Sequence, residues 1–91
     1  MTTTTEYKAT KTRFRKDTWG LTRATWDYRG VNLDYAQRTT RGAAWHVVVY
    51  GQQDWWRMLA RTKAEMMAKV DDMIDDRGYK VKAGKLIHPD R

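Results

Sequence analysis

The residues best suited to chemistry are arginines and aromatic side chains gathered between positions 45 and 61. Trp55 and Trp56 are adjacent, and Arg57 and Arg61 follow within the next five positions. A guanidinium can donate two parallel hydrogen bonds to a phosphate or to the edge of a guanine base. These residue types indicate that the segment binds an anionic ligand.

Patterns typical of catalysis or metal binding are missing from the sequence. It has two histidines, His46 and His88, 42 positions apart, and no cysteine. It shows no zinc-ligand spacing, no Gly-rich phosphate loop and no nucleophile elbow. We therefore expect a protein that is not an enzyme and that carries no metal or cofactor.

Charge is the strongest property of the whole chain. Its 91 residues include 18 Lys and Arg against 11 Asp and Glu, a net charge of +7 with a pI of about 9.9. Such a balance is typical of proteins that bind nucleic acid, an anionic surface or an acidic partner. Residues 7–61 hold eleven basic and four acidic side chains, whereas residues 62–77 carry a net charge of −2. The sequence predicts a polarised molecule with a basic sheet and an acidic helix.

Composition also bears on the cellular compartment. No run of about 18 apolar residues occurs, and no apolar signal-like segment lies near the N-terminus. The lack of cysteine fits a reducing compartment. We expect a cytoplasmic protein with no membrane partner, in the host cytoplasm if the source is a phage.

Three segments have the pattern of strands. Apolar residues fall at every second position from Val31 to Tyr35, which predicts a half-buried strand. Residues 45–50 are rich in β-branched and aromatic side chains and predict a second strand. Residues 51–54 predict a short hairpin loop that leads into a third strand over 55–61. Together these segments predict an antiparallel sheet.

A helix is predicted over residues 63–77. Thr62 and Glu65 have the spacing of a capping box, and Gly78 is placed to end the helix in a left-handed conformation. Five apolar side chains fall on one helix face: Met66, Met67, Val70, Met73 and Ile74. Four aspartates at the C-terminal end form an acidic ladder, which we interpret as a solvated surface: Asp71, Asp72, Asp75 and Asp76.

The elements predict an α+β fold. It has a three-stranded antiparallel sheet, with or without an added N-terminal strand, and one C-terminal helix packed on one face. Residues 28–77 form this sheet-plus-helix domain. Residues 1–5 are expected to be a disordered tail, 6–27 either a basic arm or an edge strand, and 78–91 a basic tail that either carries a short strand at Tyr79 to Lys82 or has none.

Strand alternation divides the sheet into a helix face and an open face. Met67, Val70 and Ile74 are expected to pack against Trp45 and Trp56. Alternation places a basic and aromatic set of side chains on the open face: His46, Tyr50, Trp55, Arg57 and Arg61. The N-terminal residues or a second subunit would cover this face under the alternative interpretation.

Three short motifs resemble a known DNA-binding family. They are Tyr28-Arg29-Gly30-Val31, Trp45 with Val47 and Val49, and the stretch Ala60-Arg61-Thr62-Lys63-Ala64-Glu65. Over about residues 28–77 the chain resembles the arm-binding domains of phage-type tyrosine recombinases, and beyond them the plant ethylene-response-factor type of domain.

The resemblance implies that a three-stranded sheet lies in the major groove of duplex DNA. By this likeness a first set of residues would reach base edges: Arg29, His46, Tyr50, Arg57 and Arg61. A second set would hold phosphates: Arg38, Arg41, Lys8, Lys11, Arg13, Arg15 and Lys16. Because no recombinase catalytic domain follows in this sequence, the module is expected to act alone.

The function expected from the sequence is that of a small DNA-binding accessory or regulatory factor from a phage or mobile element. The alternative is a protein-interaction module that binds a host or partner protein through exposed tryptophans, or that dimerises through an exposed sheet edge or face. Salt-dependent affinity for duplex DNA would distinguish the two functions.

Overall fold

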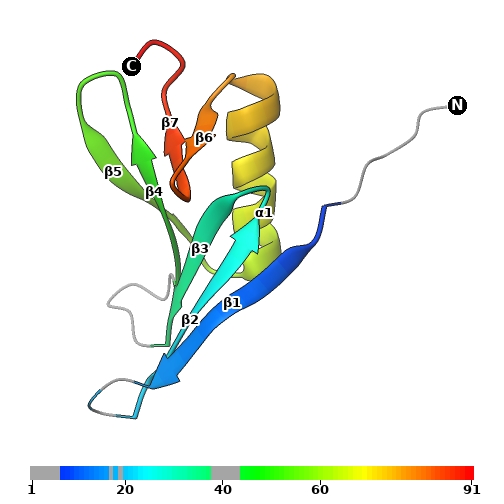
Figure 1. The fold of residues 1–91 in the computed structure, drawn as a ribbon, viewed down its shortest axis with the longest axis vertical. Helices are drawn as coiled ribbons and strands as arrows, with labels where there is room; N and C mark the ends of the chain where they lie inside the picture. Colours follow the sequence, from blue (N-terminus) through cyan, green and yellow to red (C-terminus); the bar gives the residue numbers. More distant parts are fainter. Residues whose placement is uncertain (1–6, 17, 19, 38–43) are drawn as a thin grey trace, which may run out of the picture.

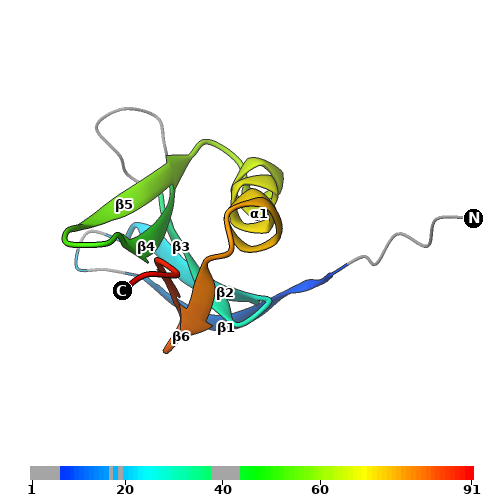
Figure 2. The ribbon, with the colours of Figure 1, turned by 90° about the horizontal axis from the view of Figure 1, so that it is seen from above.

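The structure is a computed structural model that describes residues 7–16, 18, 20–37 and 44–91. One sheet curls beside a short helix (Figures 1 and 2). In chain order the elements are β1 (Ala9–Lys16), β2 (Thr22–Tyr28), β3 (Val31–Ala36), β4 (Trp45–Tyr50), β5 (Trp55–Ala60), α1 (Lys63–Asp71), the π-helical turn η1 (Asp72–Asp76), β6 (Lys80–Lys82) and β7 (Lys85–Ile87). The strands lie in the order β1-β2-β3-β4-β7-β6, and β5 pairs with the other edge of β4.

Tight turns join neighbouring strands. Arg29 and Gly30 have φ angles of 55° and 83° between β2 and β3, and Ala83 and Gly84 have 52° and 80° between β6 and β7. Two successive residues with positive φ suit the twist of a hairpin. The predicted loop between β4 and β5 is confirmed, and it is closed by a 2.6 Å bond from Gly51 N to Asp54 O.

Strand β4 is the centre of the sheet because it pairs with three others. It pairs with β5 along its whole length and with β3 only at its start, where Tyr35 lies opposite Trp45. At its end it pairs in parallel with β7, where Val49 lies opposite Leu86. Two strands thus share one edge of β4, and β3 and β4 diverge toward the end of β4 where β7 pairs with it (Figure 1).

The core lies between this sheet and the helix. The alternation predicted for two strands is confirmed, since Val31 and Leu33 in β3 and Val47 and Val49 in β4 are fully buried. Other residues complete the core: Tyr28, Ala60, Met66, Val70, Met73 and Leu86. Of these, Leu86 comes from the C-terminal hairpin.

The helix begins where the sequence predicts. Thr62 Oγ1 accepts a hydrogen bond from Glu65 N at 3.1 Å, which confirms the N-cap. Gly78 has a φ of 72°, as expected just beyond a helix end. The buried helix residues are Met66, Val70 and Met73, while the predicted contacts Met67 and Ile74 are only partly buried.

The packing predicted for Trp56 is wrong. Its side chain is 43 % exposed, because the indole lies against Gly51 in the β4–β5 loop and not against the helix. A Cβ at position 51 would come within 2.6 Å of the Trp56 ring. Only a glycine leaves room for the ring there, so the hairpin holds this tryptophan.

The predicted three-stranded sheet is also wrong. In the part of the chain that the structure describes, the sheet has seven strands, because two further hairpins join it. Strands β1 and β2 come from the segment expected to be an arm or a single edge strand. Strand β6 confirms the short strand considered at Tyr79 to Lys82, whereas β7 was not expected; burial of Leu86 against β4 holds this hairpin in place. The expected 1–5 tail lies outside the described residues.

Candidate functional site

The face of the sheet away from the helix brings five strands together. Residues directly opposite one another on paired strands point to the same side. One row across the sheet runs through Arg13, Thr25, Asp34, His46 and Leu59. The next row contains Arg15, Arg23 and Ala36. We call this side the open face.

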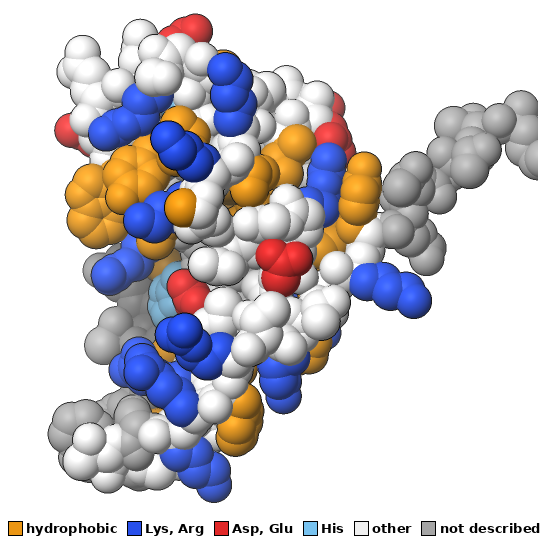
Figure 3. Space-filling view, in the orientation of Figure 1, with side chains coloured by type: hydrophobic (Ala, Val, Ile, Leu, Met, Phe, Trp, Pro, Cys, Tyr) orange, Lys and Arg blue, Asp and Glu red, His pale blue; other side chains and the backbone are white. Residues whose placement is uncertain are grey.

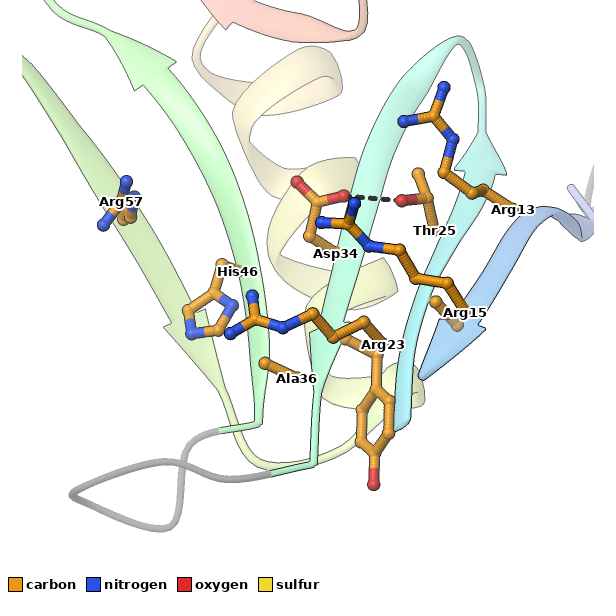
Figure 4. Close-up of a pocket in the computed structure, with 10 residues that line it drawn as sticks. Arg13, Arg15, Arg23, Thr25, Asp34, Ala36, His46 and Arg57 are labelled. Carbon is orange, nitrogen blue, oxygen red and sulfur yellow. Dashed lines mark hydrogen bonds between the residues drawn. The ribbon is translucent and has the colours of Figure 1, made fainter. Parts of the chain in front are cut away.

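A hollow of about 370 Å³ lies in the open face, as shown in Figure 4. Its polar lining comes from all five strands: Arg13, Arg15, Arg23, Thr25, Asp34, His46 and Arg57. Asp34 accepts a 2.9 Å hydrogen bond from the Thr25 hydroxyl. Among the described residues, four arginines therefore line a hollow that contains one carboxylate, a charge distribution that attracts anions.

An aromatic pair extends the open face beyond the hollow. Tyr50 lies opposite Trp55, whose side chain is 56 % exposed. The Arg57 guanidinium is 5.8 Å from the Trp55 ring centre, and Lys85 and Arg91 lie 5.3 and 4.9 Å from the Tyr50 ring centre. Figure 3 shows Lys and Arg side chains gathered along this side of the molecule.

Arg29 does not lie on the open face; it lies in the β2–β3 turn beside the helix. Its guanidinium forms ion pairs with Asp71 at 2.8 Å and Asp75 at 2.9 Å, and it stacks 4.1 Å from the centre of the Tyr7 ring. The side chain is 12 % exposed. The hydrogen bonds to Asp75 raise the pKa of Arg29, and those bonds in turn lower the pKa of Asp75. Arg29 therefore ties the β2–β3 turn to the helix.

The acidic ladder has a structural use that the sequence interpretation missed. Asp71 and Asp75 bind Arg29, and Asp71 also accepts the Tyr28 hydroxyl at 2.9 Å. Asp72 pairs with Arg77 at 3.0 Å. Three of the four carboxylates of the ladder are thus held in ion pairs at the helix end: Asp71, Asp72 and Asp75.

The remaining predicted site residues are dispersed. Lys11 points to the helix side of β1, opposite Trp26. Arg61 is exposed beyond the end of β5 and does not line the hollow. Arg38 and Arg41 lie outside the described residues. Five predicted site residues share the open face: His46, Tyr50, Trp55, Arg57 and Arg13. Alternation within β4 and β5 predicts this for all of them except Arg13, which lies in β1.

Arg23 lines the hollow although the sequence interpretation did not select it. The signal was available in β2, where Arg23, Thr25 and Asp27 alternate with Ala24, Trp26 and Tyr28. The sequence interpretation treats this segment as either an arm or an edge strand and does not assign Arg23 to a face. Arg15 was assigned to phosphate contacts and lies beside Arg23.

No protein-family model, curated protein or solved structure matches the chain. Within the described residues, no group of three or more His, Asp or Glu side chains could hold a metal ion. The helices of this part of the chain are too short or too polar to cross a membrane. The candidate site therefore rests on the geometry of the open face.

Proposed function

We propose that the chain is a small DNA-binding protein that holds duplex DNA against the open face. The observation that carries this proposal is the hollow lined by Arg13, Arg15, Arg23 and Arg57. Guanidinium groups bind phosphates through paired, charge-assisted hydrogen bonds. Phosphate contacts supply most of the affinity of a protein for DNA.

The width of the open face means that only part of it can enter a DNA groove, so we assign groove contacts and phosphate contacts to different strands. Five strands about 4.8 Å apart span roughly 19 Å, which is wider than a major groove of about 12 Å. The whole face cannot enter the groove, but a two-stranded ribbon can. The β4–β5 hairpin would enter with Tyr50, Trp55 and Arg57, while Arg13, Arg15 and Arg23 contact the flanking phosphates. This arrangement replaces the three-stranded insertion implied by the family resemblance.

Fluorescence anisotropy with a short labelled duplex tests the proposal. Affinity should fall steeply between about 50 and 200 mM salt, because binding releases counterions from the phosphates. The Arg15→Ala, Arg57→Ala double variant should bind more weakly. For each arginine that holds a phosphate, its replacement should also reduce the slope of log K against log salt by about one.

Arg77→Ala is the matched control. Arg77 is an exposed arginine at the helix end, where it pairs with Asp72 and does not line the hollow. Its loss changes the net charge without changing the open face. Equal weakening by Arg77→Ala and by the single Arg57→Ala variant, each of which removes one positive charge, would show that only net charge matters and would overturn the proposed site. No duplex affinity at about 50 mM salt would overturn DNA binding itself.

A further inference from the structure

The helix side of the sheet carries a second, apolar hollow that DNA binding does not explain. It has a volume of about 220 Å³ and lies beside the start of α1. Its lining includes four aromatic rings and two lysines: Phe14, Trp26, Tyr35, Trp45, Lys11 and Lys63. We call it the aromatic groove. Phe14 is 56 % exposed, although burial of a phenylalanine is favourable, so one wall of the groove lacks a covering group in the described chain.

Two ammonium groups flank the groove. Lys63 Nζ lies 3.8 Å from the centre of the Trp26 ring, and Lys11 Nζ lies 5.3 Å from it. Lys11 Nζ is also 5.1 Å from the Phe14 ring. Both lysines lie over aromatic rings, and within the described residues neither has a carboxylate partner. A ligand for this groove would be apolar at its centre and anionic at its ends.

The outer edge of β1 lies next to the groove. Within the described residues no segment pairs with that edge, and all of β1 except Ala9 is exposed (Figure 1). An open strand edge presents backbone N–H and C=O groups to which an extended segment can add. Such a segment would place every second side chain on the groove side.

The charge of β1 selects among possible occupants. The strand carries Lys11, Arg13, Arg15 and Lys16, and no acidic residue. Pairing with β1 of a second copy would bring four cations from each strand together, which is unfavourable. An acidic strand would instead gain favourable partners in these four cations.

We propose that the edge of β1 and the aromatic groove bind an acidic, extended segment of a partner protein. The segment adds to the sheet beside β1 and inserts one large apolar side chain next to Phe14 and Trp26. Its carboxylates pair with Lys11 and Lys63. This site lies on the opposite side of the sheet from the open face and does not depend on DNA binding.

The probe is a labelled seven-residue peptide, Thr-Glu-Thr-Leu-Thr-Glu-Thr, with both ends blocked, which as a strand presents one Leu between two Glu on the same side. A peptide with Lys in place of every Glu is the charge control. A third peptide, N-methylated at every backbone amide, has no N–H donor left with which to pair with a strand edge. The full chain should bind the acidic peptide saturably and at least tenfold more tightly than either control.

Charge reversal gives the decisive comparison. In the Lys11→Glu, Lys63→Glu variant the preference should invert, so that the Lys peptide binds more tightly. A Glu at position 63 lies in the first turn of α1, where negative charge is favourable, so folding should be retained. The Lys80→Glu, Lys82→Glu variant changes the net charge equally on exposed β6 and should keep the original preference.

Three results would overturn the proposal. The first is no saturable binding of the acidic peptide. The second is equal binding of the N-methylated peptide, which would exclude strand addition. The third is a preference for the acidic peptide that is kept in the Lys11→Glu, Lys63→Glu variant as it is in the Lys80→Glu, Lys82→Glu variant. Long-range attraction to a basic protein would then account for binding.

Discussion

Tyr28 shows how one side chain links the sheet to the helix. It is 3 % exposed, and its hydroxyl donates to Asp71, with the two carboxylate oxygens at 2.9 and 3.0 Å. Burial, together with this hydrogen bond, raises the pKa of Tyr28 to about 12. The folded protein therefore favours the neutral, protonated form of the Tyr28 side chain more than the unfolded chain does.

The raised pKa predicts a loss of stability in alkali. The contribution of Tyr28 is fully present below pH 10, its unfolded pKa, and it is lost as the pH rises toward 12. Between pH 9 and pH 11 the wild-type protein should lose about 1 kcal/mol more than Tyr28→Phe, which cannot ionise. Urea denaturation of both proteins at the two pH values measures this difference. Equal losses would show that Tyr28 ionises as freely in the fold as in the unfolded chain.

Residue identity alone could not separate Arg29 from the other arginines. It stands in a Tyr-Arg-Gly-Val stretch that resembles a DNA-contacting strand, yet it occupies a turn with positive φ. Its partners Asp71 and Asp75 are more than 40 positions away. Arg57, by contrast, was correctly placed on the open face, because alternation within one strand fixes the direction of its side chain.

At the scale of elements, the two tight turns differ in what offsets their strain. Arg29 and Ala83 both hold the left-handed conformation that non-glycine residues disfavour. Arg29 gains two ion pairs there, whereas Ala83 has only a methyl group. The β6–β7 turn therefore keeps strain that a better turn residue would relieve.

Ala83→Asn should stabilise the protein by about 0.5–1 kcal/mol, because Asn-Gly is the preferred pair for this type of turn. Thermal or urea denaturation measures the change. Arg29→Asn makes the same change at the matching position of the other turn, yet it should destabilise the protein, since Asp71 and Asp75 lose their partner. Destabilisation by Ala83→Asn would mean that the φ of this turn is not the source of strain.

Strands were predictable where alternation was strong and unpredictable where the turns lacked familiar signals. Residues 45–50 and 55–60 have β-branched or aromatic runs separated by a glycine loop, and both strands were found. The β6–β7 turn is Ala-Gly and the β2–β3 turn is Arg-Gly, so neither shows the Asn-Gly or Asp-Gly pair that marks a hairpin. Three-residue strands such as β7 are also too short to show a period.

At the scale of the whole molecule, the C-terminal hairpin completes the core. Leu86 is fully buried, and β7 pairs with the end of β4 in parallel. The sequence favoured a domain of residues 28–77 because the pairing of β4 with β7 spans 37 positions and leaves no local pattern. Only the three-dimensional arrangement shows that the hairpin supplies a core residue.

Leu86→Ala should destabilise the protein by about 2–5 kcal/mol, because the cavity it leaves is enclosed by the sheet and the helix. Val81→Ala in β6 is the control, since Val81 is exposed and should cost far less. Urea denaturation followed by far-UV circular dichroism measures both. Similar small effects would mean that the hairpin is held loosely and that the core closes without it.

The division of one edge of β4 between β3 and β7 has a further consequence. An ordinary open sheet ends in two edges, but a branched one ends in three, and in the described chain these are β1, β5 and β6. Each carries at least one cation, including Arg13 in β1, Arg57 in β5 and Lys80 in β6. Like charges on every border disfavour edge-to-edge pairing of two molecules. We therefore expect dissolved salt, which screens those charges, to make such pairing easier.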